Sequence, residues 1–238
     1  SMGGLVTRYY RQTFGPAGMR KVFFAGTPHN GAVVMYPLWE GGNPGGSNKL
    51  DRLKSEILLE NMKQGCGCNG DPDVRFIRSG CLPAVSAITS VQALLPVFPY
   101  LRGEKLKNPT RHAYIDPKDM CQQNNLLDFL NANADSMLAD SMQYFIYAST
   151  TEKTPAFVIP KSTVRDCTRE SWPDGEMASM KSAKAGDNQV LFTESACPKD
   201  SIPAFRNIPC ITEDSIHPDT KKPAAHITHS NLPIIFKE

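Results

Sequence analysis

The first thirty residues show a helical pattern of apolar positions followed by a continuous apolar run. The helical spacing is carried by Leu5, Val6, Tyr9 and Tyr10. This pattern ends at Gly15-Pro16, a pair that stops a helix. The apolar run, 21–26, is short and bounded by glycine, as buried strands of parallel sheets are. The chain therefore starts with a predicted helix and a predicted core strand, followed by a turn that ends at Gly31.

A long segment, 32–140, separates this strand from the next apolar run of the same kind, 143–148. Amphipathic spacing within it predicts one helix over 50–62 and another over 126–138. Helices and Gly/Pro loops inserted between two core strands are the layout of a lid or cap over an apolar pocket.

The rest of the chain is more polar. Proline and polar residues punctuate 150–184, which predicts mostly loop, and only 190–192 and 208–211 are short apolar segments. The order of elements predicts the α/β class. We divide the chain into a first helix and strand (1–31), a cap (32–140), and core strands and loops (141–238).

Net charge, the length of the apolar runs and the cysteine content indicate which partners and which cellular compartment to expect. The net charge of +2 gives no reason to expect a nucleic-acid partner, and no apolar run is long enough to cross a bilayer. Seven cysteines lie in loops rich in proline and glycine, which indicates disulfides and an extracytoplasmic or secreted protein; free or buried thiols are the alternative. Their spacing matches no zinc site, so we expect no metal and no cofactor.

Five segments carry a resemblance to a known family. The opening S-M-G-G-L-V resembles the second half of a nucleophile elbow, G-H-S-M-G-G, in which a serine stands between a strand and a helix. The other four are V-F-F-A-G-T-P-H-N-G at 22–31, Q-A-L-L-P at 92–96, Y-A with T-P-A-F at 147–157, and G-D-N-Q-V at 186–190. In this order they are similar to segments of lipases and lecithin:cholesterol acyltransferase-like enzymes. The last one departs from that family's G-D-G-T-V at Asn188 and Gln189.

This resemblance implies the C-terminal half of an α/β-hydrolase sheet with a large, mostly helical cap insertion. It implies a carboxylic-ester (lipid) hydrolase that acts through an acyl-serine intermediate on a lipid or small ester. Contact with a lipid surface fits such a substrate. Two alternatives stay open: an acyltransferase that moves the acyl chain to an alcohol, and a catalytically silent binding protein on the same scaffold.

The catalytic roles follow the order Ser, Asp, His along the chain. The resemblance implies Ser1 as nucleophile, Asp187 as acid and the backbone N–H of Met2 as an oxyanion-hole donor. His229, in H-S-N-L, resembles the base of H-x-N-L/M, and His226 is the alternative.

Other residues receive weaker expectations. Leu94, Leu95 and Phe98 are expected to bind substrate as part of a lid. His29 precedes the acid, so we expect it to be a structural wall residue. Solvation or a role in turns is expected of Asp166, Asp174 and Asp200.

The resemblance also implies sequence ahead of Ser1. We expect Gly-His directly before it, after an apolar strand, and the missing N-terminal half of the fold in the parent chain or in a companion chain. The alternative is that Ser1-Met2 is the remnant of an expression tag.

Overall fold

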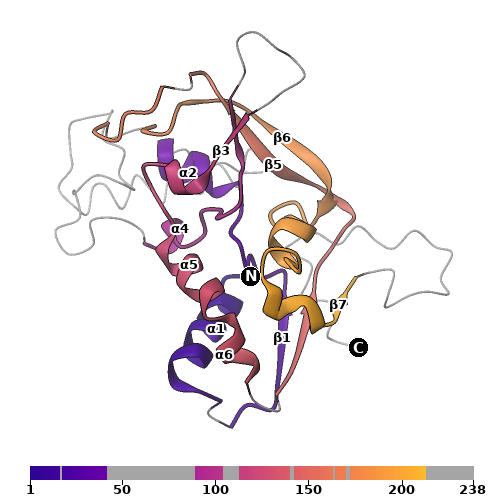
Figure 1. Cartoon of the computed structure of the whole chain (residues 1–238). Helices are drawn as coiled ribbons and strands as arrows, with labels where there is room; N and C mark the ends of the chain where they lie inside the picture. Colours follow the sequence, from indigo (N-terminus) through magenta and orange to yellow (C-terminus); the bar gives the residue numbers. More distant parts are fainter. Residues whose placement is uncertain are drawn as a thin grey trace, which may run out of the picture.

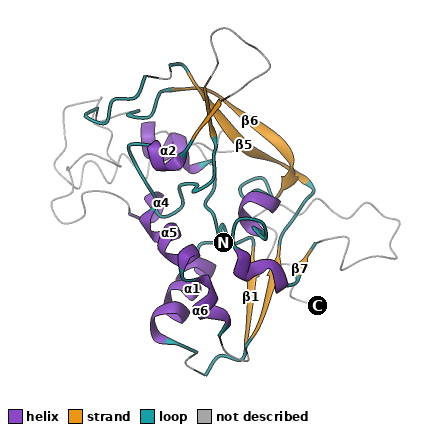
Figure 2. Ribbon diagram, viewed as in Figure 1, coloured by secondary structure: helices purple, strands orange, loops and turns teal. Residues whose placement is uncertain are grey.

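The fold combines helices with two β-sheets. The computed structural model describes residues 1–16, 18–41, 89–103, 113–139, 142–162, 164–169 and 172–212. Within these ranges, strands β1, β4 and β7 form a parallel sheet, and β3, β2, β5 and β6 form a mixed one (Figure 1). Figure 2 shows helices and strands both well represented in the described part of the chain. The predicted α/β class is therefore confirmed at this level.

The first helix and strand lie where the pattern predicts them. Helix α1 spans Gly3–Phe14 and strand β1 spans Lys21–Ala25. The helix ends at Gly15, whose φ of 81° is readily adopted only by glycine and whose N–H bonds to the Arg11 carbonyl. In β1 the buried and exposed side chains alternate, so within the described residues the strand is covered on one face.

The parallel sheet is completed by two strands from later in the chain. Strand β4 is Gln143–Tyr147 and pairs with β1, while β7 is Cys210–Ile211 and pairs with β4 on its other side. The chain reaches β4 through helices α5, Asn125–Ala132, and α6, Ala134–Leu138. The predicted strand over 143–148 is thus confirmed, and the helix predicted over 126–138 is present as two helices that meet at Asn133.

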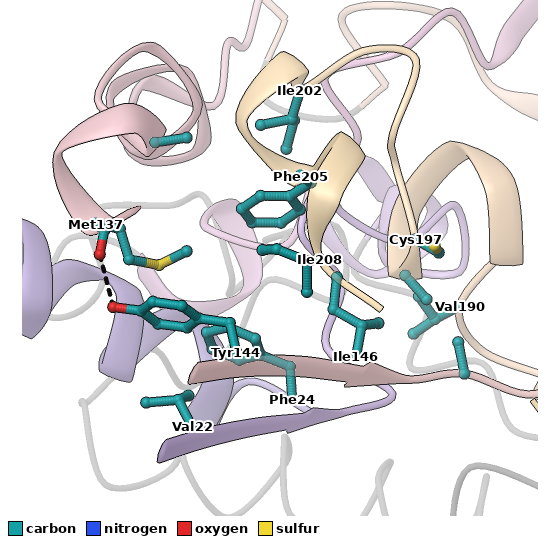
Figure 3. Close-up of a cluster of buried hydrophobic side chains, with 13 residues drawn as sticks. Val22, Phe24, Met137, Tyr144, Ile146, Val190, Cys197, Ile202, Phe205 and Ile208 are labelled. Atoms are coloured by element: carbon teal, nitrogen blue, oxygen red, sulfur yellow. Dashed lines mark hydrogen bonds between the residues drawn. The ribbon is translucent and has the colours of Figure 1, made fainter. Parts of the chain in front are cut away.

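One face of this sheet is covered by α6 and by two short helices that follow the second sheet. These are a π-helix, η2, at Phe192–Ala196 and a 3-10 helix, η3, at Pro203–Asn207. Figure 3 shows Ile202, Phe205 and Ile208 packed over the side chains of the sheet, with the Tyr144 hydroxyl donating to the Met137 carbonyl. Burial of such side chains is the main source of stability in a core of this kind.

The second sheet corrects the loop predicted over 150–184. Its two long strands are β5, Glu152–Pro160, and β6, Met177–Gly186, which form an antiparallel pair. Proline is tolerated in strands at bulges, and the register shifts between Pro155 and Phe157. The local composition of this segment suggested a loop, whereas pairing over nearly the whole length of both strands decides its structure.

The predicted cap is described only in part. It contains α2 (Met35–Gly41), α4 (Thr89–Gln92), β2 (Leu101–Gly103), β3 (Ala113–Ile115) and the 3-10 helix η1 (Pro117–Asp119). The helix predicted over 50–62 lies outside the described residues. Strand β2 pairs with β5, so this part of the chain joins the second sheet.

Helices α5 and α6, which the predicted cap includes, pack on α1. The Gln12 side chain of α1 donates to the Leu130 carbonyl of α5, and Arg11 donates to the Met137 carbonyl of α6. This end of the predicted cap is thus fixed to α1, the helix that follows Ser1 (Figure 1). In the part of the chain that the structure describes, no helix combines the length and apolar character needed to span a membrane.

Candidate active site

Ser1 lies at the junction of β1 and α1. Its amino nitrogen donates to the Ala25 carbonyl at the C-terminal end of β1, over 2.7 Å, and its own carbonyl accepts from the Gly4 N–H at the start of α1. The side chain is exposed. Ligands of open α/β sheets bind outside the carboxyl ends of the strands, and Ser1 lies at this end of β1.

The helix after Ser1 approaches the turn after β1 closely. A Cβ at Gly4 would collide with the side chain of Thr27, whereas a Cβ at Gly3 would meet open space. Small residues next to the nucleophile of such an elbow let the strand and the helix approach each other. Gly4 permits this close packing, and Gly3 has no such role among the described residues. The N–H groups at the start of a helix have no intrahelical acceptors and favour negative charge. The oxyanion-hole role of Met2, at this helix start, stays a prediction.

Asp187 follows directly after β6 and is held in a defined turn. Its carboxylate is buried, and Oδ1 accepts from the backbone N–H groups of Gln189 and Val190, at 3.0 and 2.8 Å. Asn188 has a φ of 77°, and its N–H donates to the Thr154 hydroxyl of β5. The turn role that is common for aspartates is therefore present here, and it fixes the position of the carboxyl group.

Ser1 and Asp187 lie close enough for the charge of the carboxylate to act on the Ser1 amino group. Partial burial lowers the pKa of the Ser1 amino group, and the nearby Asp187 carboxylate opposes this by raising it. Salt screens the interaction between exposed charges beyond about 10 Å at an ionic strength of about 0.1 M. The fold thus brings together a serine and a buried carboxylate that stand near opposite ends of the described sequence.

The candidate bases His229 and His226 lie outside the described residues, so the identity of the base stays a prediction. His29, in the turn after β1, lies in the core beside this site. Its ring packs edge-on against Phe24 and Phe205, and its Nδ1 is 3.3 Å from the Arg8 guanidinium.

Three effects lower the pKa of His29 well below its ordinary value. Burial is the largest, followed by the positive charges of Arg8 and of the Ser1 amino group. No residue among those described bonds to Nε2 of the ring. Burial therefore disfavours the charged form of His29, whose ring lies in the core between Phe24 and Phe205. Its role as a structural wall residue stays a prediction.

Arg8 is a buried cation that the sequence analysis missed. Its guanidinium donates to the carbonyls of His29 and Leu130 and to the Asn131 side chain, and it lies 5.0 Å from the centre of the Phe205 ring. Burial lowers its pKa to about 9. The only signal in the sequence is its position three residues after Leu5, on the buried side of α1. Arg8 ties the helix after Ser1 to α5 and to the turn that carries His29.

The three residues expected to form the lid are packed within the protein. Leu94 packs against the cluster of Leu5, Leu127 and Leu130, while Leu95 is buried and Phe98 packs against Tyr100. Gly31, in the turn after β1, lets this turn approach the segment that carries Leu95. A Cβ at Gly31 would collide with the Leu95 carbonyl. A role of these three side chains in substrate binding stays a prediction.

A cavity of about 500 Å³ opens beside Met2, the residue that follows Ser1. It lies between α1, the segment around α4 and the start of α5. Its lining is Met2, Leu5, Val6, Tyr9, Ser90, Gln92, Ala93, Asn124, Asn125 and Leu126. The size is within the range of small-molecule sites.

Two further buried acids, Glu40 of α2 and Asp174 of the loop before β6, lie close together. Of the two roles expected of Asp174, solvation is absent and a place in a turn is present. The residue is fully buried, accepts from the Cys121 N–H, and its own N–H donates to the Glu40 side chain. Burial raises the pKa of Tyr100 well above its ordinary value, and Glu40 and Asp174 add to this. Asp166 does have the expected turn role, since it accepts from the backbone and hydroxyl of Thr168.

No cluster of three or more metal-ligating side chains occurs within the described ranges. Comparison with known proteins adds no assignment, because no protein-family model and no curated protein matches the chain.

Proposed function

We propose that the chain carries the nucleophile and the acid of a serine α/β-hydrolase of the lipase and lecithin:cholesterol acyltransferase-like kind, and that it hydrolyses carboxylic esters of lipids. The observation that carries this proposal is the position of Ser1, which bonds to the C-terminal end of β1 within electrostatic reach of the buried Asp187 carboxylate. The close packing of Gly4 on Thr27 and the apolar cavity beside Met2 support it further.

The mechanism begins with attack of the Ser1 hydroxyl oxygen on the ester carbonyl carbon. The base, His229 or in the alternative His226, takes the hydroxyl proton and then gives it to the departing alcohol. Asp187 fixes the orientation and tautomer of the imidazole and stabilises its protonated form. The Met2 N–H stabilises the oxyanion of the tetrahedral intermediate. Water then attacks the acyl-serine, which releases the acid and restores Ser1.

Labelling of the intact protein with a fluorophosphonate tests the assignment of Ser1. This reagent forms a covalent bond with activated serines, because displacement of its fluoride needs a serine made nucleophilic by a base. We expect peptide mass spectrometry to find the label on Ser1, and the Ser1→Ala variant to take up none and to lose hydrolysis of p-nitrophenyl esters. Absence of label from the folded wild-type protein would exclude the enzyme and leave the silent binding protein. Transfer of the acyl group to an added alcohol in preference to water would instead favour the acyltransferase.

We also propose an extracytoplasmic location. Cys121 is bonded to Cys167 and Cys197 to Cys210, and disulfides are uncommon in reducing compartments. We expect non-reducing peptide mapping of the protein from its own cells to recover both linked pairs. Recovery of these four cysteines as free thiols would contradict the proposed location.

A further inference from the structure

The cavity beside Met2 follows one side of α1. Met2, Val6 and Tyr9 line it at helical spacing, and Leu5, which is 2% exposed, also lines it. From Met2 to Tyr9 the helix rises by about 10 Å, or two turns. The cavity therefore extends from the residue next to the candidate nucleophile along an apolar helix face.

The opposite wall carries apolar residues together with the polar residues Ser90, Gln92, Asn124 and Asn125. Asn124, the most buried polar residue of the lining, already uses its side chain: Oδ1 accepts from the Leu127 N–H, and Nδ2 donates to the Leu95 carbonyl. Ala93 and Leu126 present apolar surface. Near Tyr9, the Phe129 ring of α5 lies 6.3 Å from the Tyr9 ring and extends this surface. These features favour an apolar occupant.

We propose that this cavity binds the acyl chain of the ester, and that Val6, Tyr9 and Ala93 determine which chain lengths are accepted. The inference rests on the proposed function, because the chain would enter from an ester carbonyl held at Ser1. Met2 connects the two sites: its backbone belongs to the start of α1 beside Ser1, and its side chain lines the cavity. Acyl binding is thereby assigned to α1 and the Ala93 segment.

Filling the cavity tests this assignment. Each methylene that leaves water for such a site is expected to raise kcat/KM about fourfold. We expect Val6→Trp and Ala93→Trp each to lower the ratio of kcat/KM for p-nitrophenyl decanoate to that for the acetate ester by at least about tenfold. Val6 is 62% exposed on the surface of α1, so the larger side chain can be added without opening the core. Val164→Trp, at a position 72% exposed and outside the cavity lining, is the matched control and should keep the wild-type ratio.

A second variant guards against misfolding of the tryptophan variants. Val6→Ala enlarges the cavity and should move the preferred ester towards longer chains. An unchanged chain-length profile in folded, active Val6→Trp and Val6→Ala proteins would overturn the assignment of the cavity while leaving the proposed function intact. Absence of ester hydrolysis in the wild-type protein would overturn the proposed function, and the acyl site with it.

Discussion

Replacement of Asp187 with asparagine is expected to lower kcat for ester hydrolysis by about four orders of magnitude while the protein stays folded. The carboxylate is needed to hold the base in the tautomer that accepts the serine proton. An amide in its place can donate to the imidazole and favour the wrong tautomer. Steady-state kinetics on a p-nitrophenyl ester, with circular dichroism of the same samples, measures both parts of this expectation.

The geometry makes this substitution a clean test. The asparagine side chain keeps an oxygen at the position of Oδ1, so it can still accept from the N–H groups of Gln189 and Val190. The turn after β6 should therefore persist, and a loss of activity reports on the charge. Asp200→Asn, at an exposed position in the loop before η3, is the matched control and should keep wild-type kinetics. A loss of less than tenfold in Asp187→Asn would remove Asp187 from the catalytic machinery.

The elements predicted well from the sequence are those in which the spacing of apolar residues matches the side chains that the element buries. Helix α1 buries Leu5, and strand β1 buries Val22 and Phe24, so the apolar pattern marks both. The strands β5 and β6 were missed because their stability comes from pairing with each other. Pro155 reads as a loop signal along the chain, whereas in the structure it stands at an irregularity in that pairing.

In the candidate site, too, some features follow from a local sequence pattern and others depend on partners distant in the sequence. The motif around Ser1 and the one around Asp187 are local patterns, and each predicts a role, although only the fold could bring the two residues together. Burial of Arg8, Glu40 and Asp174 leaves no comparable local trace. A charged side chain is usually exposed, so a charge held inside by partners distant in the sequence is visible only once those partners are in place.

His29 should make the folded protein progressively less stable as the pH falls below about 6.5, the ordinary pKa of histidine. Its pKa in the folded state lies well below the ordinary value of 6.5, because the ring is buried and lies beside the Arg8 guanidinium. The unfolded chain therefore binds the proton more readily. The contribution of His29 is fully present above the unfolded-state pKa and is lost at up to about 1.4 kcal/mol per pH unit below it.

Urea unfolding of the wild-type protein and of His29→Gln at several pH values isolates this effect. Glutamine does not titrate, and its side-chain oxygen can accept from Arg8 in place of Nδ1. At pH values of about 7.5, where histidine is largely neutral in both states, the variant should be the less stable protein because it loses the ring contacts with Phe24 and Phe205. Below about pH 6.5 the wild type should lose stability faster, so that the two curves converge. Most carboxylates stay ionised down to about pH 5, which keeps their titration largely out of this window. Parallel curves for the two proteins would show that His29 is protonated as readily in the folded state as in the unfolded chain, and that the core beside Ser1 admits charge.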